Sequence, residues 1–296
     1  MTILMDGGMG GELSKRGAGA VDGLWSAQAL LDAPEIVAQV HKDYIAAGAR
    51  LIITNSYSTI PSYLAKGRLE ERYEELTALA GQIARKAADE SGEAVTVLGS
   101  LPPMSESYRA DLAPDRETSE PIYRNMVKAL LPHVDGFICE TLSTADEALS
   151  ASTAACENGE GKPVYVSWSL KEEPGKGLRS GESVTHAFKC VEHLPLTGFL
   201  FNCTHPLAVE EGLRELKALT DKPLGGYANT MTDVPEGWTL DEGHGVAGRD
   251  DGNPRLYAQA ALRWQNHGAT MIGGCCGTGP AHIAELHRRL TEPVSA

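Results

Sequence analysis

The sequence predicts an α/β protein folded as a single (β/α)8 TIM barrel. Two observations carry this prediction. Eight short apolar runs alternate with stretches of helical periodicity along the 296 residues, as in parallel sheets whose strands are covered on both faces. Polar residues follow these runs. In a barrel the carboxyl ends of all strands lie at one mouth, where the active site is found, so these residues would meet there. A doubly wound sheet shares the alternation and is the alternative fold.

The eight predicted strands are short and almost uninterrupted in apolar residues. Each is separated from the next by enough chain for a helix with its turns. In chain order they are Ile3–Asp6, Leu51–Asn55, Val95–Ser100, Gly136–Glu140, Val164–Ser169, Gly198–Asn202, Pro223–Ala228 and Thr270–Gly274.

Two of the intervening helices have clear boundary signals. One is expected to begin at Pro34 and to end at Gly48, and a second ends at Gly268, because proline suits the first turn of a helix and glycine suits its end. Apolar residues recur four positions apart in both. They are Ile36, Val40 and Tyr44 in the first helix and Leu256, Ala260 and Trp264 in the second.

Composition predicts one cytosolic domain over residues 1–296. The chain is 42% hydrophobic, and no linker or low-complexity segment divides it, so one barrel of roughly 250 residues fits. No signal peptide or membrane-spanning run is found, and six cysteines in a reducing compartment favour metal ligands or buried thiols over disulfides. The formal net charge of −14 disfavours nucleic acid and anionic membranes as partners. A homo-oligomer is compatible with the sequence.

Three cysteines form a candidate metal site. Cys275 and Cys276 are adjacent and flanked by glycines, and Cys203 lies 73 positions before Cys276, too far for a local zinc finger. Cys203 follows the sixth predicted strand and the pair follows the eighth, so closure of a barrel would bring the thiols together. Three thiolates on Zn²⁺ leave a fourth position open for a substrate. The alternative is a set of buried apolar thiols beside a tight turn.

Several segments together resemble the homocysteine S-methyltransferases. The cysteine pair is the specific motif, and the similarity spans nearly the whole chain. The segments are Asp6-Gly7-Gly8-Met9-Gly10-Gly11-Glu12-Leu13, Leu24-Trp25-Ser26-Ala27, Ile53-Thr54-Asn55-Ser56-Tyr57, Gly99-Ser100-Leu101-Pro102-Pro103, Cys139-Glu140-Thr141, Asn202-Cys203-Thr204 and Gly273-Gly274-Cys275-Cys276-Gly277-Thr278. The resemblance implies a zinc-bearing (β/α)8 barrel that transfers a methyl group to the sulfur of homocysteine and so makes methionine.

The resemblance also implies roles for residues that bind the amino acid. Glu140 contacts the homocysteine ammonium group, Asp6 assists, and backbone amides of the Gly7-Gly8-Met9 turn hold the carboxylate. Glycines suit that turn because they let the backbone approach an anion closely. Asn229 matches a position whose side-chain oxygen can occupy the zinc before substrate arrives. The alternatives are a strand-end ion pair for Glu140 and a plain turn residue for Asp6.

The ligand set suits thiol chemistry better than hydrolysis. Three thiolates give a zinc site a formal charge of −1, so the metal activates water less well than one held by neutral histidines. A free thiol has a pKa of about 8.5, and coordination would remove its proton at neutral pH. A zinc hydrolase would need histidine and aspartate ligands at strand ends, and His205 after Cys203 is better explained as a surface or capping residue.

The methyl donor is expected to be a sulfonium compound. Donors of the family are onium compounds such as S-methylmethionine, S-adenosylmethionine and betaine, whose positive charge favours aromatic walls. Candidates for such a wall, or for the core instead, are Trp25, Tyr57, Tyr108 and Trp168. The chain ends soon after its final predicted helix, whereas betaine-type enzymes carry a longer C-terminal region, which favours the sulfonium compounds. A separate corrinoid partner and a non-catalytic homocysteine-binding subunit are the remaining alternatives.

One segment departs from the family pattern. Met231–Asn253 is long, glycine-rich and acidic, and it is interpreted as a lid over the site or as a solvated insertion. Its acidic residues are Asp233, Glu236, Asp241, Glu242, Asp250 and Asp251.

Overall fold

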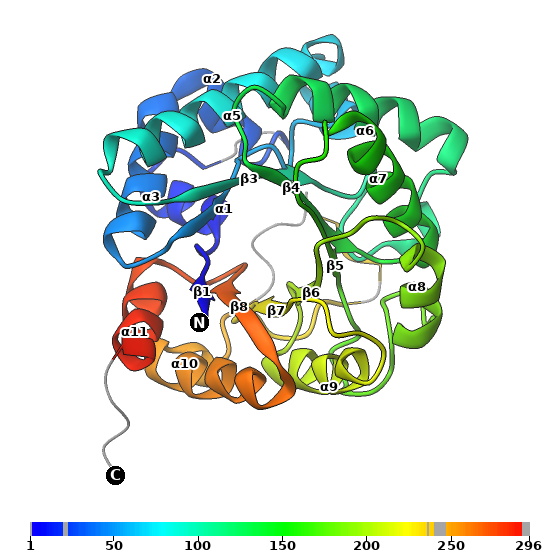
Figure 1. Cartoon of the computed structure of the whole chain (residues 1–296). Helices are drawn as coiled ribbons and strands as arrows, with labels where there is room; N and C mark the ends of the chain where they lie inside the picture. The colour runs from blue at the N-terminus through cyan, green and yellow to red at the C-terminus, as the bar shows by residue number, and fades with distance from the viewer. Residues whose placement is uncertain (1, 20–22, 236, 240–246, 292–296) are drawn as a thin grey trace.

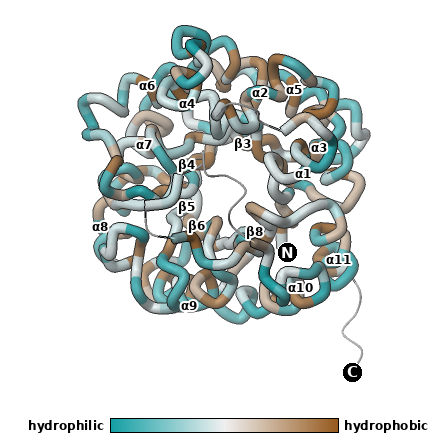
Figure 2. Tube along the Cα trace, turned by 180° about the vertical axis from the view of Figure 1, so that it is seen from behind, coloured by the Kyte–Doolittle hydropathy of each residue, from teal (hydrophilic) through white to brown (hydrophobic). Residues whose placement is uncertain are grey.

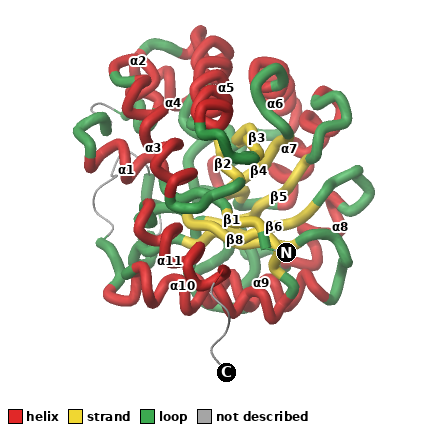
Figure 3. Tube along the Cα trace, turned by 60° about the vertical axis from the view of Figure 1, so that its left-hand side comes forward, coloured by secondary structure: helices red, strands yellow, loops and turns green. Residues whose placement is uncertain are grey.

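Eight parallel strands form the centre of the structure and helices surround them. The protein is described by a computed structural model that covers residues 2–19, 23–235, 237–239 and 247–291. Figure 1 is viewed through the ring of strands, with the helices around it, and Figure 3 shows the helices in red outside the strands in yellow. The strands are hydrogen-bonded in the order β1-β8-β7-β6-β5-β4-β3-β2. This arrangement confirms the predicted (β/α)8 barrel.

All eight strands lie where the apolar runs predicted them, and no strand end differs from its prediction by more than two residues. Their bounds are β1 Ile3–Leu4, β2 Leu51–Ile53, β3 Thr96–Leu101, β4 Gly136–Leu142, β5 Val164–Trp168, β6 Gly198–Asn202, β7 Leu224–Ala228 and β8 Ala269–Gly274. Both faces of the strands are largely buried, which explains the continuous apolar runs.

The ring closes between β1 and β2. The amide of Arg50 donates to the carbonyl of Leu4 at 2.8 Å, and the amide of Asp6 donates to the carbonyl of Leu51 at 3.0 Å. Met5 and Leu51 form a parallel bridge between these bonds. A doubly wound sheet would leave both edges open, so this closure excludes the alternative fold.

The helices follow the strands around the outside. Their bounds are α1 Met9–Lys15, α2 Ala27–Asp32, α3 Pro34–Ala46, α4 Pro61–Leu64, α5 Tyr73–Glu90, α6 Arg116–Leu130, α7 Ala145–Asn158, α8 Val184–Val191, α9 Pro206–Lys217, α10 Pro254–Arg263 and α11 Pro280–Thr291. The predicted start at Pro34 and stops at Gly48 and Gly268 are confirmed, with both glycines at positive φ. None of the described helices combines the length and apolarity that a membrane span needs.

The core-facing side of α10 differs from the prediction. Leu256 is 40% exposed, whereas Tyr257, Ala261 and Trp264 are buried. Asn253 caps this helix by accepting a hydrogen bond from the amide of Leu256. The buried residues keep the expected spacing of three to four, but the stripe begins one residue later than predicted.

Apolar residues form two packed layers. One lies between strands and helices, and the other fills the barrel with Met5, Leu51, Leu98, Ile138, Leu200, Tyr227 and Met271. Hydrophilic residues lie along the outer rim of the ring of helices (Figure 2). Because the barrel interior is filled, an open site can form only at a mouth.

Candidate metal centre and substrate cavity

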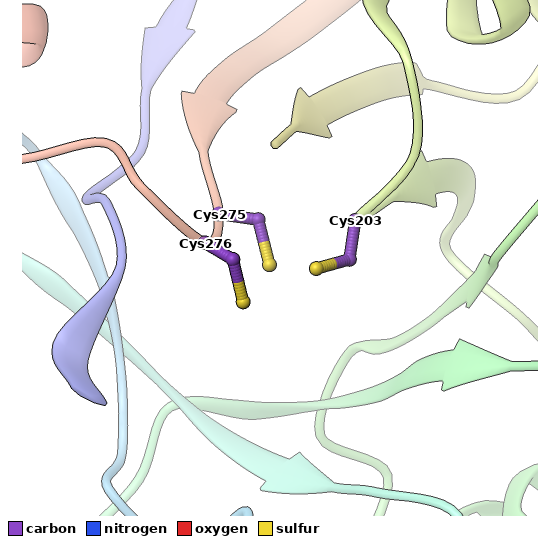
Figure 4. Close-up of side chains that lie close together, drawn as sticks. All are labelled: Cys203, Cys275 and Cys276. Atoms are coloured by element: carbon purple, nitrogen blue, oxygen red, sulfur yellow. The ribbon is translucent and has the colours of Figure 1, made fainter. Parts of the chain in front are cut away.

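Cys203, Cys275 and Cys276 meet at the carboxyl ends of the strands. Cys203 follows β6 and the pair follows β8. Their sulfur atoms all lie within 4.8 Å of one another, and among the described residues they are the one such group of cysteine, histidine and acidic side chains. Figure 4 shows the three sulfurs directed toward one region. Barrel closure thus brings together thiols that are far apart in sequence.

The backbone fixes these positions through its neighbours. The amide of Cys203 donates to the carbonyl of Tyr227 at 3.1 Å, and the amide of Cys275 donates to that of Ala228 at 2.8 Å. Gly277, which follows the pair, has φ +80°, and a Cβ there would lie 2.1 Å from the Thr230 hydroxyl. Glycine is therefore required at that turn.

The donor set fits a zinc ion. Zn–S bonds of about 2.3 Å in a tetrahedron imply sulfurs roughly 3.8 Å apart, and sulfurs that all lie within 4.8 Å of one another are compatible with that arrangement. Hydrogen bonds from Cys275 and Cys276 lower the pKa of the Cys203 thiol, while their contacts with Cys203 raise the pKa of both partners. The cluster therefore shares protons that a metal would displace.

A cavity of about 410 Å³ opens beside the thiols. This volume suits a small ligand. The cavity is lined by the three cysteines and by most of the predicted substrate-binding residues, namely Asp6, Gly7, Gly8, Met9 and Glu140.

Glu140 is a buried carboxyl group at the end of β4. One of its oxygens accepts a hydrogen bond from the Ser100 hydroxyl at 2.6 Å, and the other accepts one from the Tyr227 hydroxyl at 3.0 Å. Burial raises the pKa of Glu140 to about 7, although these two hydrogen bonds oppose the shift. No Lys or Arg side chain in the described chain pairs with it, so the strand-end ion pair is not formed. The group is placed to receive a cationic ligand.

Asp6 is the second buried carboxyl group of the cavity. It accepts a hydrogen bond from the amide of Ile53 at 2.9 Å. Burial raises the pKa of Asp6 well above its usual value, and the nearby charge of Glu140 adds to the shift. Two buried acids facing one cavity make that region favourable for a cation.

The buried Glu140 carboxylate should lower the stability of the metal-free protein at alkaline pH. The native state binds this proton more tightly than the unfolded state, so the free energy of unfolding falls between pH 4.5 and about 7, by an amount on the order of 3 kcal/mol. Glu140→Gln should therefore raise Tm by several degrees at pH 8. It should change Tm little at pH 4.5 and below, where both proteins are neutral at this position. Thermal unfolding at both pH values checks this, and an equal change at both would contradict it.

The turn before α1 packs against the cysteine pair. The amide of Gly8 donates to the Thr278 hydroxyl at 3.2 Å, and a Cβ at Gly8 would lie 2.6 Å from the carbonyl oxygen of Cys275. The Gly8 amide is therefore engaged with Thr278 in this structure, and the role of the Gly7-Gly8-Met9 turn in binding the carboxylate stays a prediction.

Asn229 is not among the described residues that line the cavity. Its Oδ1 accepts hydrogen bonds from the amide of Met231 at 3.3 Å and from the Arg249 guanidinium at 3.2 Å. The side-chain oxygen expected to occupy a metal is thus engaged with the following loop in this structure, and its role on zinc stays a prediction.

Five aromatic residues line the cavity: Tyr227, which bonds Glu140, and two pairs. Trp25 and Tyr57 meet edge to face with ring centres 5.7 Å apart, and Tyr108 and Trp238 lie 5.8 Å apart. Trp168 lies elsewhere, stacked on Phe199 in the core, so its place in a donor wall is wrong. Trp238 was not predicted to line the cavity. The one feature of the sequence that could have indicated it is that Trp238 is the single aromatic residue in the acidic segment Met231–Asn253.

Backbone strain gathers at this cavity. Of the described non-glycine residues with positive φ, four line it: Trp25, Tyr108, Thr141 and Cys203. Such residues cost of order 1–3 kcal/mol each and cluster at functional sites. The Tyr108 hydroxyl donates a hydrogen bond to the Cys203 sulfur at 2.8 Å, a contact that no sequence pattern indicated.

The described parts of the acidic segment border the cavity. Met231 and Gly248 form an antiparallel bridge at its base, and both line the cavity together with Trp238. Glu236, Asp241 and Glu242 lie outside the described residues. Beyond Tyr108 and Trp238 lies an open cleft of about 1450 Å³ lined by charges of both signs. The described residues of this segment therefore favour the interpretation as a lid over the site rather than as a solvated insertion.

His205 caps α9. Its Nδ1 accepts a hydrogen bond from the amide of Leu207 at 3.1 Å. The capping interpretation is confirmed, and no histidine joins the thiol cluster among the described residues.

Comparisons with known proteins point to one family. A sequence model described as homocysteine S-methyltransferase matches residues 3–290. The homocysteine S-methyltransferase YbgG of Bacillus subtilis (strain 168) is 32% identical over 306 residues, covering 96% of this chain and 93% of that protein. The homocysteine S-methyltransferase of Escherichia coli (strain K12) is 32% identical over 307 residues, covering 97% and 94%. A selenocysteine methyltransferase of Astragalus bisulcatus is 29% identical, covering 98% and 92%.

A solved structure agrees with these sequence similarities. The homocysteine methyltransferase MmuM from Escherichia coli, in its metallated form, matches with a TM-score of 0.80 at 29% identity. The match covers 97% of this chain and 96% of that one. Similarity therefore extends over the barrel and its mouth together.

Proposed function

The chain belongs to the homocysteine S-methyltransferase family, and from this membership we propose that it methylates the sulfur of L-homocysteine to give methionine, with zinc held by Cys203, Cys275 and Cys276. The barrel, residues 1–296, is one homocysteine-binding unit. The observation that carries the proposal is that these three thiols and the buried carboxyl group of Glu140 face one small cavity. An amino acid with a terminal thiol matches this cavity, because its ammonium group suits the carboxyl group of Glu140 and its sulfur suits the metal held by the three thiols.

The acceptor is bound by its two ends. Glu140, assisted by Asp6, binds the ammonium group, and backbone amides of the Gly7-Gly8-Met9 turn receive the carboxylate. When bound, zinc supplies the Lewis acidity that lowers the pKa of the homocysteine thiol. The three cysteine thiolates leave the centre negatively charged, so the substrate sulfur keeps electron density for attack on carbon. The thiol proton leaves to solvent.

The donor is a sulfonium compound, S-methylmethionine or S-adenosylmethionine. Trp25, Tyr57, Tyr108 and Trp238 offer aromatic faces that attract a cation. In the transfer, the homocysteine sulfur bonds to the methyl carbon, and the carbon–sulfur bond of the donor breaks. The electron pair stays on the donor sulfur, which becomes a neutral thioether. The cleft beyond Tyr108 and Trp238 gives room for the remainder of a larger donor.

Methionine formation with a panel of donors tests this proposal. Zinc-quantified protein is incubated with homocysteine and, separately, S-methylmethionine, S-adenosylmethionine, betaine or a methylated corrinoid, and methionine is measured by mass spectrometry. We expect turnover with at least one sulfonium donor and none with betaine, since the thioether that a sulfonium donor releases is a better leaving group than the tertiary amine that betaine would release, whereas the aromatic walls attract either cation. Turnover with betaine or the corrinoid alone would contradict the donor assignment. Silence with every donor despite one zinc per chain would favour a binding subunit or another acceptor.

A further inference from the structure

Tyr108 reaches the thiol cluster from a distant part of the chain. It lies on the loop after β3, and its hydroxyl donates to the sulfur of Cys203, after β6, at 2.8 Å. In the described chain, no other hydroxyl group forms a hydrogen bond to these three sulfurs. A phenol placed here contacts the ligand cluster directly while leaving its ring in the wall of the substrate cavity.

A largely buried ion pair packs against the ring of Tyr108. The guanidinium carbon of Arg179 lies 4.5 Å from the centre of that ring. Arg179 is bonded to Glu172 at 2.5 Å, and their side chains are only 10% and 12% exposed. A cation over the face of a phenol is attracted to the ring and draws electron density from it, which strengthens the hydroxyl as a donor.

The same ion pair holds the backbone of Cys203 and of the residues after it. Arg179 donates to the carbonyl of Cys203 at 3.5 Å, and Glu172 accepts from the amide of His205 at 2.8 Å. Glu172 also accepts from the Thr204 hydroxyl at 3.3 Å. Both partners of the phenol–thiol bond are thus anchored to one pair of charges.

Backbone strain at both residues indicates that the hydrogen bond between Tyr108 and Cys203 is specifically placed. Tyr108 has φ +65° and Cys203 has φ +50°, a region that costs energy for residues with a side chain. A ring that only filled space would not require this conformation at both ends of one hydrogen bond. Tyr57 is the internal comparison, because it lines the same cavity but bonds Ser107 at 2.7 Å.

We propose that Tyr108, anchored by Arg179 and Glu172, is a positioning residue for the thiolate of Cys203 in the metal centre. This inference rests on the proposed function, because it takes Cys203 as a ligand. The hydrogen bond orients the sulfur and withdraws part of its negative charge, which offsets the charge that accumulates when three cysteine thiolates and a substrate thiolate meet. Partners of metal ligands typically change metal affinity or activity 10–100-fold when removed.

Tyr108→Phe is the test, because it keeps the ring over Arg179 and removes only the hydroxyl. Zinc affinity is measured by competition with a chromophoric chelator, and the sulfur-to-cobalt charge-transfer band is recorded after Co²⁺ substitution, both without homocysteine or donor. We expect zinc affinity to fall by about tenfold or more. The band should move to longer wavelength, since a thiolate without this hydrogen bond gives up an electron more easily. Tyr57→Phe, the matched control, should leave both measurements at the wild-type values.

Unchanged affinity and an unchanged band in Tyr108→Phe would overturn the inference alone. Failure of the wild-type protein to bind either metal would overturn the proposed zinc centre and the inference together. Arg179→Lys is the second variant. It keeps a charge facing Glu172 but removes the planar group under the ring, and it should shift the band in the same direction by a smaller amount. Circular dichroism confirms that each variant is folded.

Discussion

Replacement of Cys276 by alanine is expected to abolish stoichiometric zinc binding and to lower methyl transfer by at least about 10³-fold. Two thiolates cannot retain the metal as three do, and a Lewis acid contributes several kcal/mol to charge stabilisation. Cys276 lies on a turn fixed by Gly277 and by the bond from the Thr230 amide to its own carbonyl at 2.9 Å. Loss of the side chain should therefore leave that turn intact. Zinc per chain is measured by elemental analysis and activity by methionine formation.

Cys190→Ala is the matched control for Cys276→Ala. Cys190 is a partly exposed free cysteine on α8, outside the thiol cluster. Its removal should leave zinc content and activity unchanged. Full zinc and full activity in Cys276→Ala would show that the metal assignment is wrong.

Replacement of Glu140 by glutamine should weaken homocysteine binding by about 30-fold or more while leaving zinc in place. Loss of one partner of a buried charge pair costs roughly 2–5 kcal/mol, and Glu140 is only 6% exposed. Glutamine keeps the size of the side chain and can still accept from Ser100 or Tyr227. Calorimetric titration of the zinc-loaded protein with homocysteine gives the change in Kd.

The zinc content and the KM for the donor serve as internal controls for Glu140→Gln. Both should match wild type, because Glu140 is placed at the ammonium end of the acceptor. Unchanged homocysteine affinity would contradict its role. Loss of zinc as well as homocysteine binding would indicate that Glu140 supports the fold of the site.

The sequence predicted best those features that depend on the order of strands and helices along the chain. Apolar runs predicted the strands because parallel strands are buried on both faces, and the polarity of the fold then placed Cys203, Cys275 and Cys276 at one mouth. The structure brings their sulfurs within 4.8 Å. Asp6 and Glu140 also ended predicted strands, and both line the cavity.

Side-chain direction and loop paths could not be predicted in this way. Trp168 and Trp238 are equally aromatic in sequence, yet one stacks on Phe199 and the other reaches Tyr108. The difference depends on contacts between distant segments. Asn229 directly follows β7, but its side-chain oxygen accepts a hydrogen bond from Arg249, which lies 20 residues later. The bond from Tyr108 to Cys203 joins two loops 95 residues apart, so no local pattern could indicate it.

X-ray absorption spectroscopy at the zinc edge tests the central claim most directly, because it counts the sulfur atoms around the metal. The account predicts three sulfur neighbours at about 2.3 Å in the protein alone. It predicts four after homocysteine is added. A zinc site that shows fewer than three sulfurs, or the same sulfur count with and without homocysteine, would contradict it.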